Sequence, residues 1–261
     1  MKQYKAYAKV NIFLKITGTR NNYHEILSRF MRVENLFDTL YFKEKLSPSK
    51  EFVLEGDFSC STQQNTIYKA YTHLLEYTHS QPLQEWMEQH AIVVKKSIPA
   101  FAGLGGGSSD AATYLMMCNE VLDLGLSTSA LMEIGVRVGA DVPFFLSGYQ
   151  SANVRGIGEI IEPFEEDVLP LDIYTPDIEI STPKVYGVYR EHFFHPIDAN
   201  TQQQLASMSS LAIMQKYTPL EANDLFAPAM QLYPLLRVEH KEGYFFSGSG
   251  SSFFRVHKDG K

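Results

Sequence analysis

A glycine-rich segment near the middle of the chain is the part best suited to bind a ligand. Four glycines fall within residues 103–107, and two serines follow directly. Residues 111–115 begin a helical pattern, and the apolar residues 91–95 predict a strand. A glycine loop between a strand and a helix N-terminus directs backbone N–H groups and the positive end of the helix dipole at one point. We therefore expect residues 99–110 to bind a phosphate group.

Two common phosphate-binding patterns do not match this loop. A Walker loop carries a lysine after its last glycine, and Ser108 occupies that position here. A dinucleotide-binding fingerprint that began at Gly103 would need a third glycine at the same position. The remaining alternatives are another kind of phosphate loop or a tight turn that binds nothing.

Two polar residues lie close together in the first predicted strand, residues 6–17. Side chains on a strand alternate between its faces, so Lys9 and Asn11 share one face. An ammonium group and an amide aligned in this way could hold an anion. The alternative is an ordinary face that is exposed to solvent.

Asp141 follows a helix that we expect to begin at Ser127 and to end near Gly139. Pro143 disfavours helical conformation at Val142, so we expect the chain to become extended at this point. The Asp141 carboxylate is then either a general base aimed at the phosphate site or the cap of a turn.

Two further segments offer contacts to a ligand. Tyr23 and His24 follow a predicted turn over residues 18–22, and such a pair could stack on a nucleobase and hydrogen-bond to its edge. The alternative is a surface loop. Residues 246–253 form a second glycine loop between apolar runs, which is either a hairpin turn or another close approach of the backbone to a ligand.

The composition is that of a globular protein with a large core. The chain has 261 residues, of which 44% are hydrophobic, and a net charge of −7, which argues against nucleic acid or an anionic membrane as the main partner. Cys60 and Cys118 show no metal-binding or redox spacing, so a cytoplasmic location fits best. We expect no membrane span, because no apolar run approaches about 18 residues.

The order of patterns predicts an α+β fold with two domains, residues 1–150 and 151–261, and a ligand cleft between them. Strands are expected at residues 6–17, 28–43, 52–56, 91–95, 172–174 and 178–181, and helices at residues 66–78, 111–122, 127–139, 202–215 and 224–236.

Taken together, these motifs resemble the GHMP kinase superfamily, and within it the branch that phosphorylates 4-diphosphocytidyl-2-C-methyl-D-erythritol. The combination of A-K-V-N, Y-H-E and G-A-D-V-P is more specific than any single motif. The matching segments span nearly the whole chain, at residues 8–14, 23–25, 65–67, 99–110, 139–145, 155–159, 181–183, 223–225 and 247–250.

The resemblance implies a two-domain GHMP kinase fold, with an N-terminal βαβ-type domain, a C-terminal ferredoxin-like domain and the active site in the cleft between them. It implies transfer of the γ-phosphoryl group of ATP, with Mg²⁺, to the 2-hydroxyl group of the substrate in non-mevalonate isoprenoid precursor synthesis. Asp141 would be the general base, and Lys9 would hold it ionised and orient it.

The resemblance also implies two sets of binding residues. ATP would be bound by Asn65, Lys96, Ser97, Pro99, Ala100, Phe101, Ala102, Gly103, Leu104, Gly105, Gly106, Gly107, Ser108 and Ser109. The substrate would be bound by Asn11, Tyr23, His24, Thr182, Tyr186 and Gly248, with the two tyrosines on either side of cytosine and His24 at its edge.

Some features depart from the family pattern or stay open. Phe101 and Ala102 stand where the family loop usually carries glycines, so we expect a stiffer first half of the loop. No protein ligand is assigned to Mg²⁺. The partner is expected to be a small molecule, and the chain a monomer or weak homodimer. The competing interpretations are another GHMP kinase, acting on homoserine or mevalonate, and a nucleotide-binding protein without catalysis.

Overall fold

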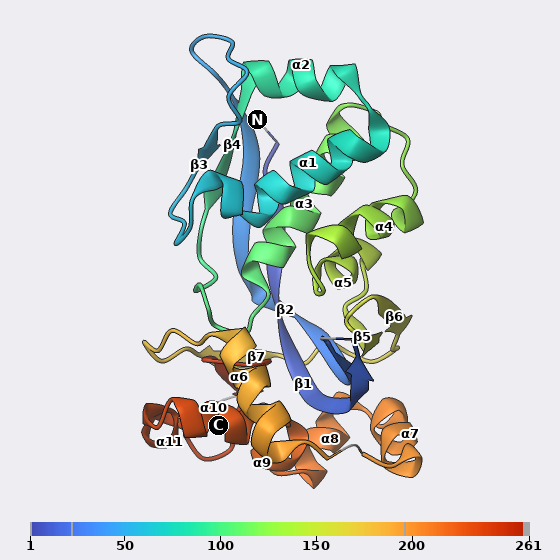
Figure 1. Cartoon of the computed structure of the whole chain (residues 1–261), viewed down its shortest axis with the longest axis vertical. Helices are drawn as coiled ribbons and strands as arrows, with labels where there is room; N and C mark the ends of the chain where they lie inside the picture. Colours follow the sequence, from blue (N-terminus) through green and yellow to red (C-terminus); the bar gives the residue numbers. More distant parts are fainter. Residues whose placement is uncertain (1, 22, 196, 258–261) are drawn as a thin grey trace. The chain divides into compact units, whose positions relative to one another are not determined.

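The structure, a computed structural model, describes residues 2–21, 23–195 and 197–257. The chain divides into two compact units, each built from segments distant in the sequence (Figure 1). Unit 1 is formed by Met1–Ala8, Asn35–Ile98 and Gly106–Gly148, and unit 2 by Lys9–Glu34, Pro99–Gly105 and Tyr149–Lys261. The sequence domains 1–150 and 151–261 stay a prediction, and the compact units group the chain in a different way.

Two long strands supply residues to both units. They are β1 (Tyr4–Arg20) and β2 (Tyr23–Glu44), which pair with each other. In unit 1, residues 39–44 of β2 pair with β4, and in unit 2, residues 26–31 of β2 pair with β5, both antiparallel. Among the described residues the sheet also includes β3 (Leu54–Glu55), β4 (His90–Lys95), β5 (Ser151–Gly156) and β6 (Ile160–Pro163).

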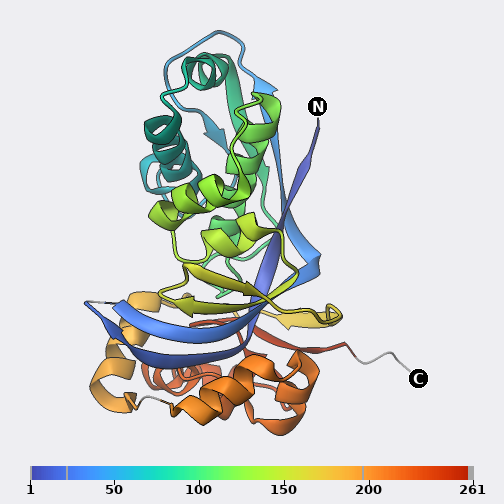
Figure 2. The same cartoon turned by 90° about the vertical axis from the view of Figure 1, so that its right-hand side faces the viewer.

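The helices of unit 1 lie together on one side of its strands (Figure 2). In the described part of the chain they are α1 (Thr66–Thr78), α2 (Gln81–Gln89), α3 (Gly106–Val121), α4 (Thr128–Val138) and α5 (Val142–Ser147), with a 3-10 turn at Thr62–Gln64. Helix α3 is buried along much of its length, and its Tyr114 and Leu115 join Leu40 and Ile92 of the sheet in one apolar core. Burial of such side chains is the main driving force for this packing.

Unit 2 contains a second small sheet, in which β9 (Phe253–Val256) pairs antiparallel with β7 (Leu171–Tyr174) and β8 (Phe245–Phe246). Phe226 stacks on Phe246 with ring centroids 4.6 Å apart, beneath this sheet. Its helices in the described residues are α6 (Thr182–Val188), a π-helical turn (Tyr189–Phe193), α7 (Ala199–Ser207), α8 (Ser210–Lys216), α9 (Pro219–Ala222), α10 (Phe226–Leu232) and α11 (Leu235–Glu239).

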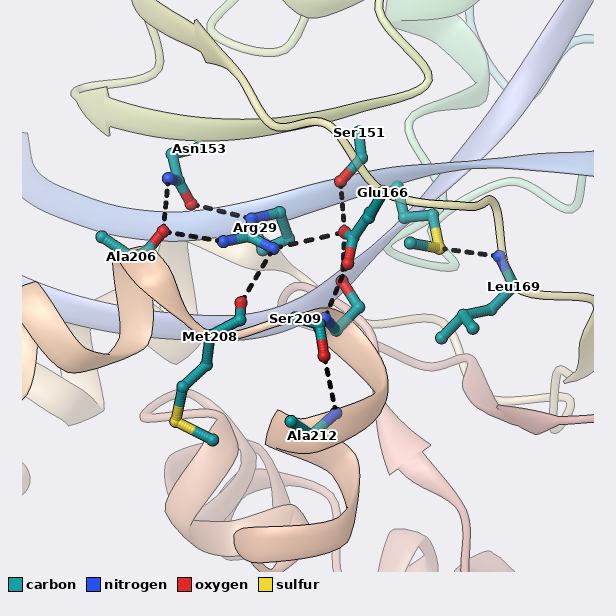
Figure 3. Close-up of polar contacts among 11 residues, drawn as sticks. Arg29, Ser151, Asn153, Glu166, Leu169, Ala206, Met208, Ser209 and Ala212 are labelled. Carbon is teal, nitrogen blue, oxygen red and sulfur yellow. Dashed lines mark hydrogen bonds and ion pairs between the residues drawn. The ribbon is translucent and has the colours of Figure 1, made fainter.

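A buried ion pair joins the strands of unit 2 to its helices (Figure 3). Arg29 of β2 is fully buried and lies 3.2 Å from Oε1 of Glu166. Its guanidinium also donates to the carbonyl oxygens of Ala206 and Met208, at the end of α7. Glu166 in turn accepts from the backbone N–H and hydroxyl of Ser210, which begins α8. The cluster therefore fixes the α7–α8 connection on β2.

The structure confirms the predicted α+β class and most of the elements. Thr66–Thr78 is helical as predicted, and Asn65 caps it by accepting from the backbone N–H of Ile67. Ser127 caps α4 in the same way through Ala130. The predicted turn at residues 18–22 begins later, since β1 continues to Arg20; residue 22 lies outside the described residues.

Several predicted elements were wrong in detail. Val142 is helical, because Pro143 occupies the first turn of α5, where a missing N–H costs the helix nothing. Residues 178–181 form no strand. The helix predicted over residues 202–215 is divided, since Ser209 is extended and caps α8, and the one over residues 224–236 is divided before Pro234. None of the described helices combines the length and apolarity needed to cross a bilayer.

Candidate active site

Lys9 and Asn11 meet inside unit 2, on one face of β1. Their exposed fractions are 3% and 2%. Lys9 Nζ donates a hydrogen bond to Asn11 Oδ1 over 2.7 Å, and Asn11 Nδ2 donates to Ser28 Oγ over 3.0 Å. Nζ also lies 4.5 Å from the centre of the Phe30 ring. Because both side chains are buried, the solvent-exposed alternative is wrong. A buried and oriented ammonium is a group that can act on a ligand.

The first half of the glycine loop packs on this pair. The backbone N–H of Lys9 donates to the Leu104 carbonyl over 3.0 Å, and Lys9 Nζ lies 3.2 Å from the Gly103 carbonyl oxygen. Gly103 has φ +71°, and a Cβ there would lie 2.2 Å from the carbonyl oxygen of Ser247. Only glycine fits this close approach.

The two glycine loops are joined directly within unit 2. Ser247 Oγ donates to the Gly103 carbonyl over 3.0 Å, and the backbone N–H of Ser252 donates to the Ala102 carbonyl over 3.1 Å. A Cβ on Gly248 would lie 3.3 Å from Asn11 Oδ1. The second loop connects the antiparallel strands β8 and β9, so the predicted hairpin turn is confirmed, and the same loop lies against the Lys9–Asn11 pair.

Asn223 supports the second loop through hydrogen bonds to its backbone, a role that the sequence analysis missed. It is buried, and its Nδ2 donates to the carbonyl oxygens of Phe246 and Gly248, each over 2.9 Å. Thr182 reaches the same loop, with its Oγ1 2.6 Å from Ser249 Oγ. Thr182 and Gly248, both predicted to bind substrate, therefore lie near one another.

His24 and Tyr186 form an aromatic pair in unit 2. Their ring centroids are 5.1 Å apart, with 30° between the planes, and Tyr189 lies edge-on to His24 at 5.9 Å. His24 is 7% exposed, and its Nε2 has no hydrogen-bond partner among the described residues. Burial, with the positive charge of Arg190, lowers the pKa of His24. A neutral imidazole results, whose buried Nε2 receives no hydrogen bond from the described residues.

Phe101 keeps the backbone conformation that glycine would favour. Its φ is +53° and its ring is half exposed, beyond Pro99 and Ala100 in a segment without regular structure. A left-handed conformation costs a non-glycine residue roughly 1–2 kcal/mol. Phe101 therefore adopts, with backbone strain, a conformation that glycine adopts freely.

The second half of the glycine loop begins α3 in unit 1. Gly105 also has positive φ, and a Cβ on Gly106 would lie 2.9 Å from the side chain of Ile98. Thr66 Oγ1 donates to the Gly107 carbonyl over 2.6 Å, which ties the start of α1 to this turn. Residues 106–109 form the first turn of α3, whose N–H groups have no partner within the helix. Unit 1 thus presents a helix N-terminus of the kind that can bind an anion, with Asn65 next to Thr66.

Asp141 lies near the same helix N-terminus. It immediately precedes α5, and its side chain makes no capping bond to that helix. The turn that carries it approaches α3, since a Cβ on Gly139 would lie 3.8 Å from Ser108 Oγ. The half-buried Asp141 carboxylate is therefore not used as the cap of α5.

Lys96 belongs to a buried charge cluster in unit 1. Its ammonium forms an ion pair with Asp38 and a second one with Asp110 over 2.7 Å. Burial raises the pKa of Asp110 to about 7, against the opposing charge of Lys96. The sequence analysis missed Asp38 and Asp110. For Asp110, the one signal in the sequence was its place near the start of a predicted helix. Nothing in the sequence pointed to Asp38.

The described residues hold no group of three or more His, Cys, Asp or Glu side chains arranged to bind a metal ion. Magnesium in phosphoryl-transfer sites is usually held by substrate phosphates and water with one or two carboxylates, so a group of three protein ligands is not required.

Comparison with known proteins agrees with this geometry. Residues 65–149 match the family described as GHMP kinases N terminal domain. The 4-diphosphocytidyl-2-C-methyl-D-erythritol kinase of Sulfurimonas denitrificans is 59% identical over 98% of this chain and 97% of its own length. The enzyme of that name from Helicobacter pylori is 40% identical over 97% of this chain and 93% of its own length.

Solved structures have the same fold. A crystal structure of 4-(cytidine 5'-diphospho)-2C-methyl-D-erythritol kinase is 30% identical, with a TM-score of 0.72 over 98% of this chain and 90% of that one. Mevalonate kinase from Methanococcus jannaschii has a TM-score of 0.61 at 12% identity, over 99% of this chain and 91% of that one, which shows the fold alone. This chain belongs to the GHMP kinases, in the family of 4-diphosphocytidyl-2-C-methyl-D-erythritol kinases.

Proposed function

We propose that this chain transfers the γ-phosphoryl group of ATP to the 2-hydroxyl group of 4-diphosphocytidyl-2-C-methyl-D-erythritol, a step of non-mevalonate isoprenoid precursor synthesis. The observation that carries the proposal is the 59% identity, over nearly the full length of both chains, to a kinase named for this substrate. The buried Lys9–Asn11 pair against Gly103 supports catalysis rather than simple nucleotide binding.

The start of α3 fits a triphosphate by its donor set. Gly106 and Gly107 let Ile98 and Thr66 pack closely against this turn, since a Cβ at either position would lie within 3.2 Å of one of these side chains. The N–H groups of residues 106–109 point out of the helix, where the helix dipole also favours an anion. When bound, ATP would supply the phosphoryl group and Mg²⁺ would neutralise its charge. Asn65, Lys96 and Ser97 would form the adenosine side of this site.

Asp141 is proposed as the general base and Lys9 as its cationic partner in the reaction. Asp141 would accept the proton of the 2-hydroxyl group, because the turn that carries it approaches the start of α3, where the phosphates would bind. Lys9 would stabilise the negative charge that develops at that oxygen. Phosphoryl transfer has a loose transition state, so positioning and charge stabilisation by these residues supply most of the rate enhancement.

The cytidyl group would bind at His24 and Tyr186. The unpartnered Nε2 of the neutral His24 can hydrogen-bond to the edge of a cytosine. The ring of Tyr23 is 65% exposed, so one of its faces is available for stacking. Asn11, Thr182 and Gly248 would lie near the methylerythritol moiety.

Three further points are part of the proposal. Mg²⁺ would be held by phosphate oxygens and water. A cytoplasmic location is supported by the free cysteines, of which Cys60 is exposed and would oxidise readily in other compartments. The chain is proposed to be a monomer or weak homodimer. Sedimentation velocity in the analytical ultracentrifuge would determine this state.

A substrate panel with ATP and magnesium tests the function. We expect release of ADP with 4-diphosphocytidyl-2-C-methyl-D-erythritol, competition by CDP, and no turnover of homoserine or mevalonate. Turnover of one of those two alcohols without competition by CDP would assign another GHMP kinase activity. ATP binding without ADP release from any alcohol would leave a nucleotide-binding protein.

The Asp141→Asn variant tests the mechanism in the same assay. We expect kcat to fall by about 10³-fold or more while the affinity for ATP stays within about threefold, because the amide keeps the shape but not the basicity. A kcat close to that of the unaltered protein would remove Asp141 as the base.

A further inference from the structure

Asp38 is a buried carboxylate that none of the proposed catalytic steps uses. It lies on β2 with no exposed surface. Its Oδ1 accepts the backbone N–H groups of Ser97, over 2.5 Å, and Ile98, over 2.8 Å. Residues 96–98 follow β4, so the carboxylate fixes the chain where it leaves the sheet. Charge-assisted hydrogen bonds of this kind are about twice as strong as neutral ones.

The other oxygen of Asp38 holds the side chain of Lys96. The last strand pair in this part of the sheet is Thr39 with Lys95, so the next position places Asp38 opposite Lys96. The ammonium forms an ion pair with Asp38 Oδ2. Burial lowers the pKa of Lys96, but Asp110 and Asp38 outweigh this effect and raise it overall. Lys96 therefore remains charged in the fold.

Asp110 is the weaker of the two partners of Lys96 near neutral pH. Its Oδ2 lies 2.7 Å from Lys96 Nζ, while its Oδ1 is buried without a hydrogen-bond partner among the described residues. With a pKa of about 7, Asp110 carries a proton part of the time, and Lys96 and Asp38 are the charged groups that face it. A protonated carboxyl attracts an ammonium far less than a carboxylate does. Asp38 is then the stronger ion-pair partner of Lys96.

The held ammonium lies beside the phosphate-binding turn. Lys96 Nζ is 3.6 Å from the position that a Cβ of Gly106 would occupy, at the first residue of α3. Without Asp38, the Lys96 side chain would lose its free rotation only when the nucleotide binds, at a cost of about 1.5–2 kcal/mol. With Asp38 in place, Lys96 is already oriented before a nucleotide arrives.

We propose that Asp38 is a positioning residue for nucleotide binding, which holds Lys96 and Ser97 in the geometry that receives ATP. This inference rests on the proposed function, since it takes Lys96 and Ser97 to belong to the ATP site. Asp38 itself touches neither ATP nor the substrate, and it acts through the two residues that it holds.

The test compares ATP affinity, by calorimetry, with kcat and KM in the full chain and in three variants. Asp38→Asn keeps one acceptor oxygen but places an amide against Lys96; Lys96→Met removes the ammonium; the third variant combines both. Asp57→Asn is the matched control, because it removes an exposed carboxylate from the same unit. Circular dichroism at the assay temperature verifies that each variant is folded.

We expect Asp38→Asn to raise the Kd and KM for ATP about 10-fold or more, with kcat changed less than about threefold. The affinity of the double variant for ATP should lie within about threefold of that of Lys96→Met. The asparagine keeps an acceptor oxygen for the N–H groups of Ser97 and Ile98, so Asp38→Asn loses only its hold on Lys96. An ATP affinity of Asp38→Asn within twofold of the unaltered protein, or additive effects in the double variant, would overturn the inference.

A second comparison covers the case in which Asp38→Asn does not fold. Asp110→Asn leaves Lys96 held by Asp38 alone, so its ATP affinity should stay within about threefold of the unaltered protein. A loss of about 10-fold or more in Asp110→Asn would make Asp110 the anchor and contradict the proposal. Failure of the unaltered chain to bind ATP at all would instead contradict the proposed function.

Discussion

The Lys9 ammonium donates a 2.7 Å hydrogen bond to Oδ1 of Asn11, two residues further along the same strand. The orientation of the amide is determined by its neighbours. Ser28 gives its one hydroxyl hydrogen to the Phe13 carbonyl, so it can only accept from Asn11 Nδ2. The amide oxygen must then face Lys9. Three residues of two strands, Asn11, Ser28 and Phe13, thus orient the Lys9 ammonium, and the site depends on this chain of bonds.

Removal of this ammonium should affect catalysis more than folding. In Lys9→Met the side chain keeps most of its volume but loses the charge and the bonds to Asn11 and the Gly103 carbonyl. We expect kcat to fall about 10²–10⁴-fold in the ADP-release assay. Lys50→Met, which removes an exposed lysine, should keep kcat within about twofold. Equal activity of the two variants would exclude a catalytic role for Lys9.

Two glycines with nearly the same backbone conformation should respond differently to alanine. Gly103 and Gly125 have φ +71° and +66°, but a Cβ on Gly103 would lie 2.2 Å from the Ser247 carbonyl oxygen, whereas a Cβ on Gly125 meets nothing within 4 Å. We expect Gly125→Ala to lower the free energy of unfolding by about 1 kcal/mol, from backbone strain alone. Gly103→Ala should cost about 3 kcal/mol or more, because the two loops must separate. Urea unfolding measures both values, and equal losses would show that the loops do not need this close approach.

The Arg29 cluster should be a major source of stability in unit 2 (Figure 3). Glu166→Gln leaves the fully buried guanidinium of Arg29 without a counter-charge, so we expect the free energy of unfolding to fall by about 3 kcal/mol. Glu55→Gln is the matched control, since the Lys43–Glu55 pair has both side chains nearly half exposed. The control should cost less than about 1 kcal/mol. Similar losses in chemical denaturation would contradict the importance assigned to the buried pair.

Asp110 should make stability depend on pH between its ordinary and its raised pKa. The folded state keeps the proton up to about pH 7, while the unfolded chain releases it near pH 3.8. The folded state therefore binds more protons in this interval, and its stability falls as the pH rises through it. Asp110→Asn removes this effect, so the variant should gain about 2–3 kcal/mol relative to the unaltered protein between pH 5 and pH 8. A difference in unfolding free energy that stays constant with pH would refute the assignment.

Local patterns were sufficient for the elements that carry the site. The alternation around Lys9 and Asn11, the glycines of the loop and the cap at Ser127 each depend on neighbours within a few residues, and the structure agrees with all three. Local patterns failed where a proline or a cap competed with periodicity. Pro143 begins a helix instead of ending one, and Ser209 interrupts a segment whose apolar spacing predicts one continuous helix.

By itself, the sequence determined the α+β class, the glycine loop before α3 and the shared face of Lys9 and Asn11, because backbone conformation and strand alternation are local properties. Only the tertiary structure decided that Gly103 meets Ser247, that Asp38 holds Lys96 and that Arg29 pairs with Glu166. These partners are separated by 144, 58 and 137 residues. Contacts across such distances arise from strand register and from the burial of charge, which no short stretch of sequence contains.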